Sequence, residues 1–288
     1  MKKIFIYTFI CSIFLSAFSF SQRLKTPTLS PFSKISQEIG LTEINLEYSR
    51  PSAKGRIIFG GLVPFDKVWR TGANASTKIT FIEEVRVAGH PIKPGTYALY
   101  TIPGKDEWTM IIHSNIKLRS LAGGVYNPAE DVFRFKVKPK MIDQYVETFT
   151  IQFSDLKTNS LNLQLIWANT LVNIPIEVEV DKKIAHQMQE MLIDPTKIPH
   201  RTYFEAAQYY LNNNKNLGEA LAWIDKALEK SPKNFRYGLL KAKIQDKSGD
   251  NQTALITINL AHTWAKKAKN ANYIEQTELF RKSLLKRK

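Results

Sequence analysis

Cysteine is almost absent from this chain of 288 residues. The single one, Cys11, lies in an apolar run near the N-terminus. The rest of the sequence therefore excludes a disulfide framework, a thiolate metal centre and a cysteine nucleophile. The five histidines do not stand in pairs at metal-ligand spacing, which disfavours a histidine-based metal site. We expect no metal and no cofactor.

Motifs of familiar catalytic machinery are also missing. No Gly-x-Ser-x-Gly elbow of a serine hydrolase occurs. Gly60-Gly61 lacks the spacing and the following helix of a dinucleotide fingerprint. The sequence therefore predicts no catalytic residues and, although the question stays open, favours a protein that is not an enzyme.

Long apolar runs are confined to the N-terminus. Lys2 and Lys3 precede the apolar residues 4–18, and Ser19-Phe20-Ser21 forms a small-x-small site before Gln22. This pattern predicts a secretory signal over residues 1–21, cleaved after Ser21. The alternative is a membrane anchor, but the run is shorter than the roughly 20 residues that span a bilayer. We expect an exported protein, periplasmic or extracellular, that does not span the membrane after signal removal.

The positive charge is unevenly distributed. The net charge is +15, and residues 22–180 contribute +4 while residues 181–288 contribute +9. A basic half of this kind could bind nucleic acid, anionic lipid or an acidic partner. Export disfavours nucleic acid, and a solvated lysine-rich surface is the simpler explanation.

The first half of the chain has the two-residue period of β-strands. Residues 22–36, with Pro27 and Pro31, predict a linker or edge arm, and residues 37–180 predict an antiparallel β-sandwich-like domain. We expect a turn at 90–95. We also expect two separate strands at 161–167 and 172–180. The apolar face of the first has odd-numbered residues, from Leu161 to Trp167, and that of the second has even-numbered residues, from Val172 to Val180.

The second half has a helical period. Residues 181–200 predict a helix and linker, and residues 201–288 predict helical repeats. An offset of 34 residues relates Ala220 to Ala254, Ile224 to Ile258 and Ala227 to Ala261. This spacing is typical of tetratricopeptide-like units, here 201–234 and 235–268, with a capping helix at 272–286. A generic helical bundle is the alternative. The predicted class is thus α+β with two domains.

Two blocks of sequence resemble a known family. The first reads SRPSAKGR at 49–56, IFGGLVP at 58–64 and KVWRTGAN at 67–74, and the second reads PGTYALYTIPGKDEWT at 94–109. Over about residues 35–180 the chain resembles domain-of-unknown-function family 2911. The resemblance implies export, a β-rich domain and, in some members, a helical-repeat tail, but no activity. The chain departs from the family near 118–126, where Leu121-Ala122-Gly123-Gly124 replaces an expected Trp-Gly element.

The first block contains the candidate ligand-binding residues. Several cations near glycine turns could bind a carboxylate, phosphate or sulfate, and a tryptophan could stack on a sugar or planar ring. The alternative is structural, with arginines bonded to carbonyls and to the aspartate, a core tryptophan and an asparagine in a turn. The candidates are Arg50, Lys54, Arg56, Asp66, Trp69, Arg70 and Asn74.

Three functions follow as hypotheses. The first is a non-catalytic binding or scaffold protein of the cell envelope, with a protein partner bound by the helical repeats. Tyr203, Tyr209 and Tyr210 could line a groove there, although stacking between repeats is their commoner role. The second is a β domain that binds a small anionic or carbohydrate ligand. The third is a glycan-active enzyme, in which Asp66 pairs with His113 only if the fold brings them together.

Overall fold

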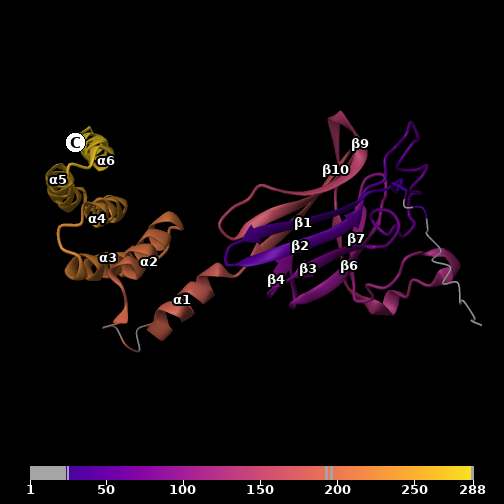
Figure 1. Cartoon of the computed structure of the whole chain (residues 1–288), viewed down its shortest axis with the longest axis horizontal. Helices are drawn as coiled ribbons and strands as arrows, with labels where there is room; N and C mark the ends of the chain where they lie inside the picture. The colour runs from indigo at the N-terminus through magenta and orange to yellow at the C-terminus, as the bar shows by residue number, and fades with distance from the viewer. Residues whose placement is uncertain (1–23, 25, 192–193, 195–196, 287–288) are drawn as a thin grey trace, which may run out of the picture. The chain divides into compact units, whose positions relative to one another are not determined.

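The computed structural model describes residues 24, 26–191, 194 and 197–286. The described chain divides into two compact units at the bond between Val178 and Glu179. The first is built of antiparallel β-strands and the second of α-helices, which confirms the predicted α+β class (Figure 1). The predicted export signal, 1–21, lies outside the described residues.

Six strands form the larger sheet of the β unit, in the order β1-β2-β3-β6-β7-β8. Every neighbouring pair is antiparallel. Their bounds are β1 Phe32–Ile39, β2 Thr42–Ser49, β3 Thr77–Phe81, β6 Gly95–Ile102, β7 Trp108–His113 and β8 Asp131–Val137.

Four strands form the second sheet, in the order β5-β4-β10-β9. Their bounds are β4 Val85–Val87, β5 His90–Ile92, β9 Lys140–Ser154 and β10 Ser160–Val178. In Figure 1 the long β9–β10 hairpin is drawn in magenta to pink.

The core of the β unit lies between the two sheets. Tyr48 on β2 is buried, and its hydroxyl donates to the carbonyl of Ile151 on β9 and accepts from the Ile151 N–H, at 3.0 and 2.8 Å. The Tyr48 and Phe149 rings meet edge to face with centroids 5.9 Å apart. The alternating apolar residues of the two sheets thus face one another, as in a β-sandwich.

Two local expectations were wrong. Residues 160–178 form one strand, because the change of parity marks a bulge: the pairing of β10 with β9 shifts on either side of Ala168, whose φ is 50°. Residues 90–92 form strand β5 rather than a turn. Pro91 is tolerated there because β5 is at the edge of its sheet.

The predicted arm, 22–36, overlaps β1, the edge strand of the larger sheet. Most of the described residues of this arm are exposed, which accounts for the lack of an apolar alternation in its sequence. A surface ion pair joins Lys34 to Glu47 across β1 and β2, at 3.1 Å.

Six helices make up the described part of the second unit: α1 Val180–Met191, α2 His200–Asn212, α3 Leu217–Lys230, α4 Phe235–Lys247, α5 Asn251–Lys267 and α6 Ala271–Leu285. From α2 onward each helix packs against the next. The side chains of Asn216, Asn234, Asp250 and Asn270 accept backbone N–H groups at the starts of α3 to α6. None of the helices that the structure describes is both long and apolar enough to cross a bilayer.

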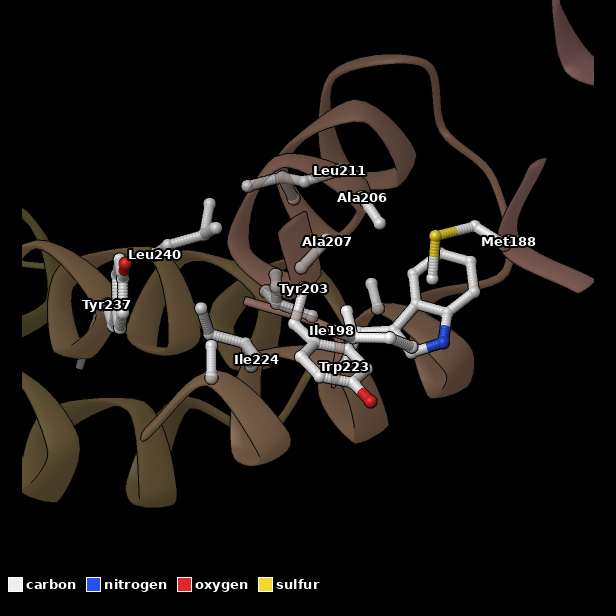
Figure 2. Close-up of a cluster of buried hydrophobic side chains, with 13 residues drawn as sticks. Met188, Ile198, Tyr203, Ala206, Ala207, Leu211, Trp223, Ile224, Tyr237 and Leu240 are labelled. Carbon is white, nitrogen blue, oxygen red and sulfur yellow. The ribbon is translucent and has the colours of Figure 1, made fainter. Parts of the chain in front are cut away.

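The core of the helical unit contains one of the tyrosines considered for a groove (Figure 2). Tyr203 is buried with Trp223 and Ile224. Tyr210 meets Trp223 edge to face, and the hydroxyl of Tyr209 donates to Asp181 at 2.7 Å. The groove interpretation is therefore wrong for Tyr203. α3 and α5 begin 34 residues apart, and α2 and α4 begin 35 residues apart. The tetratricopeptide assignment stays a prediction.

Candidate functional site

The connection between β2 and β3, residues 50–76, is fastened to both sheets. On the larger sheet, Trp69 N–H donates to the Thr101 carbonyl at 2.7 Å, and Thr101 N–H donates to the Trp69 carbonyl at 2.9 Å. On the smaller sheet, Ala53 N–H donates to Glu147 O and Phe149 N–H donates to Pro51 O, both at 2.8 Å. These bonds hold a chain segment without regular structure in a fixed place.

Aromatic side chains fill the space beneath this connection. Trp69 stacks on Trp167 of β10, with centroids 5.9 Å apart and planes 21° apart. Phe149 meets Trp69 at 5.1 Å, and Phe59 lies 6.1 Å from it. Trp167 is 1% exposed and its indole N–H donates to Glu147 O, whereas Trp69 is half-buried. Trp69 therefore packs against core residues on one side and is partly exposed to solvent.

A cavity of about 350 Å³ opens beside these rings, and we call it the cation cleft. Lys54, Arg56 and Arg70 line it with Trp69 and Trp167, and the described lining contains no aspartate or glutamate. Gly72 lets the backbone approach closely: its φ is 147°, and a Cβ there would lie 3.0 Å from the Ser49 carbonyl oxygen. The Glu147 carboxylate lies outside this lining and accepts the Lys54 backbone N–H at 2.7 Å.

The arginines of the cleft are oriented by backbone carbonyls, as the structural interpretation expects. Arg56 donates from Nε to Ala53 O at 2.8 Å and from Nη2 to Ser52 O at 2.7 Å. Arg70 donates from Nη1 to Arg119 O at 2.8 Å. A guanidinium has five N–H donors, so these bonds hold each group in place and leave most of its donors unused.

The other half of the structural interpretation is wrong. Within the described chain, Asp66 makes no ion pair with an arginine. Lys54, Arg56 and Arg70 likewise have no carboxylate at ion-pair distance among the described residues. An anion entering the cleft would thus meet three cations that are not already neutralised by a side chain.

Three predicted site residues do not line the cation cleft. Arg50 donates to Phe149 O at 3.2 Å and to Thr150 Oγ1 at 2.7 Å, so it joins the start of the connection to β9. Asp66 is exposed, with φ 57°, and its N–H donates to Pro103 O. Asn74 has φ 63° and donates to Ser30 O and Ser49 Oγ, as expected of a turn residue.

The proposed acid–base pair is not formed. His113 is completely buried, and its carboxylate neighbours are Glu130 at 3.7 Å and Asp131 at 3.9 Å, not Asp66. His113 Nδ1 accepts the Asn115 N–H at 3.0 Å, so the ring proton lies on Nε2, 3.3 Å from Asn127 O. His113 is not among the lining residues of the cation cleft or of the second cavity beside the connection, which is described below.

The residues around His113 form a structural cluster. Asp131 accepts the Tyr126 hydroxyl and Arg134 Nε, each at 2.6 Å, and burial raises the pKa of Tyr126. Within the described chain, no three His, Cys, Asp or Glu side chains are grouped so as to hold a metal ion.

Sequence reasoning missed Trp167 and the apolar wall residues Leu62 and Val63. Trp167 was assigned to a strand face, and only the pairing of β10 with β9 brings it under the connection. Leu62 and Val63 follow Gly60 and Gly61 inside the first family block. The glycines indicate a turn there, but no feature of the sequence indicates that the next two residues line a cavity.

The two sheets define a β-sandwich-like unit, and the glycine-rich connection and the paired tryptophans give it a cavity with a cationic and aromatic wall. A protein-family model described as "Protein of unknown function (DUF2911)" matches residues 30–176, and the chain belongs to this family. The comparisons found no match among curated proteins and none among solved structures.

Proposed function

We propose that the protein is an exported, non-catalytic binding protein of the cell envelope, whose β unit holds a small anionic ligand in the cation cleft. One observation carries the proposal: three cationic side chains line a cavity whose described wall contains no carboxylate. Export rests on the sequence pattern of residues 1–21.

The chemistry of the wall supports a ligand with a carboxylate or phosphate. Arg56 and Arg70 retain paired N–H donors that match the oxygens of such groups, and Lys54 adds a point charge. Trp69 offers a half-buried ring for the face of a sugar or planar group. A volume of about 350 Å³ suits a ligand the size of one acidic or phosphorylated sugar.

A thermal-shift panel on the purified protein tests this function. It compares glucuronate and glucose 1-phosphate with neutral glucose, and adds anionic cell-wall fragments. We expect the anions to raise the melting temperature and neutral glucose to leave it unchanged. The rise should disappear in Arg70→Ala and persist in Arg86→Ala, because Arg86 is an exposed arginine that also donates to one carbonyl, Gly89 O, but lies outside the cleft.

A partner for the helical unit is the second candidate. Ile256 and Leu260 lie one turn apart on α5 and are 58% and 50% exposed. Two exposed apolar side chains on one helix face, within a unit of net positive charge, favour an acidic protein partner with an apolar patch. Ile256→Asn with Leu260→Asn should abolish recovery of that partner from envelope fractions, while Lys243→Asn on α4 should not.

A further inference from the structure

A second cavity in the β unit, which we call the apolar cavity, is larger than the cation cleft. Its volume is about 550 Å³, within the usual range for sites that hold small molecules. Phe59, Phe65 and Trp108 line it, with Ile57, Met141 and Tyr145. All of these residues belong to the β unit, and only Arg56 is shared with the cation cleft.

The wall of the apolar cavity is built by an irregularity of the smaller sheet. Ala168 of β10 pairs with Val146, but Thr170 pairs with Met141, so residues 142–145 of β9 have no partners in the ladder. Asn169 holds this bulge, because its side-chain amide donates to Ile142 O at 3.0 Å and to Asp143 O at 3.4 Å. Bulges commonly redirect side chains at functional positions.

Apolar side chains at the cavity remain exposed to water. Ile57 is 77% exposed and Met141 is 79% exposed, while Trp108 is buried. An apolar ligand that covered Ile57 and Met141 would remove their surface from water, which is favourable in proportion to the area covered.

The charges at the cavity have one sign. Arg56 and Lys105 belong to the described lining, which contains no aspartate or glutamate. Lys105 is exposed in the β6–β7 turn and makes no ion pair with a described carboxylate. An occupant with one anionic group would satisfy both cations.

From these observations we infer that the apolar cavity is a binding site for an amphipathic small molecule with an apolar body and one anionic group, placed against Arg56 and Lys105. The site shares only Arg56 with the cation cleft among the described lining residues. Lys105 and Met141 line only the apolar cavity, whereas Lys54 and Arg70 line only the cation cleft. Each site can therefore be altered without the other.

Displacement of a fluorescent probe tests the inference. Anilinonaphthalene sulfonate has an aromatic body and one sulfonate, and we expect it to bind the purified full-length protein saturably. Decanoate should displace it about two- to fivefold better than decanol, because decanoate adds a surface charge pair to the same apolar contact.

Two exposed positions provide the variants, so that neither change threatens folding. Lys105→Glu should remove the preference for decanoate over decanol. Met141→Glu should weaken the binding of the probe, of decanoate and of decanol. Lys93→Glu makes the same charge change at an exposed position outside the cavity and should alter neither. Arg70→Ala should leave decanoate displacement unchanged, which separates this site from the cation cleft.

Equal displacement by decanoate and decanol in the unaltered protein would overturn the charge assignment. Probe affinity unchanged in Met141→Glu, with the fold verified by circular dichroism, would overturn the location.

Discussion

The rings of Trp69 and Trp167 are stacked, with centroids 5.9 Å apart and planes inclined by 21°, although one belongs to an irregular connection and the other to β10. The connection is held to the larger sheet through the two Trp69–Thr101 bonds, whereas Trp167 belongs to the smaller sheet. The stacked pair therefore links the sheets and also forms part of the cleft wall.

Trp69→Ala should destabilise the β unit. Removing the ring leaves a space against Trp167 and Phe149, and large-to-small changes of this kind lower the free energy of unfolding by about 3 kcal/mol. Trp69→Phe, which keeps an aromatic ring, should lower it by less. Urea denaturation measures both, and equal stabilities for Trp69→Ala and the unaltered protein would refute the core role.

Arg50→Ala should separate structure from binding. Arg50, directly after β2, is joined to β9 through Phe149 O and Thr150 Oγ1, so its loss should lower the free energy of unfolding by about 1–2 kcal/mol. Because Arg50 does not line the cation cleft, ligand affinity should be unchanged. Arg70→Ala should show the converse pattern. Urea denaturation and ligand titration of both variants distinguish the two roles. A loss of ligand affinity in Arg50→Ala would show that Arg50 also belongs to the binding site.

The contribution of Asp181 to the stability of the helical unit should be full above about pH 4 and should be lost progressively as the pH falls below it. Hydrogen bonds from Lys215 and Tyr209 lower the Asp181 pKa below its ordinary value of 3.8. A carboxyl whose pKa is lower in the folded state stabilises the fold above its unfolded pKa, and this contribution is lost as the pH falls through the folded pKa.

Helical circular dichroism during urea unfolding, at several pH values, measures the effect. Asp181→Asn should be less stable than the unaltered protein at pH 7, and the difference should shrink towards zero as the pH falls below 4. A difference that is the same at pH 7 and at pH 2 would contradict the assignment.

Gly238→Ala should destabilise the helical unit, although alanine favours helices by about 1 kcal/mol over glycine. A Cβ at Gly238 would lie 2.8 Å from Ala261 Cβ and 2.9 Å from Trp264 Cζ3, so α4 and α5 would have to separate. We expect a net loss of about 1–2 kcal/mol from overpacking. Lys243→Ala, an exposed change on the same helix, should stay within about 0.5 kcal/mol. Thermal unfolding compares them.

The sequence predicted elements wherever a local period decides structure. The alternation of Ile44, Leu46 and Tyr48 predicted β2, and the helical period predicted the second unit. The prediction was wrong where the pairing of strands decides the structure. The change from odd- to even-numbered apolar positions around Ala168 indicated two strands but marks a bulge within one strand. Pro91 indicated a turn but lies in an edge strand.

The candidate site was predicted in part for the same reason. The family block marked Lys54, Arg56, Trp69 and Arg70, which line one cavity. It could not identify Trp167, which only the β9–β10 pairing places there. The sequence also could not show that Arg50 and Asn74 donate hydrogen bonds to the backbone carbonyls of Phe149 and Ser30. Hydrogen-bond partners that are distant in the sequence leave no local pattern.

Calorimetric titration of glucuronate and glucose 1-phosphate into the purified protein, Arg70→Ala and Arg86→Ala tests the central claim most directly. We expect at least one anion to bind the unaltered protein and Arg86→Ala, with affinity about tenfold or more lower in Arg70→Ala, as expected when a hydrogen bond to a charged group is lost. Equal affinities in the two variants, or neutral glucose binding as tightly as the anions, would contradict it.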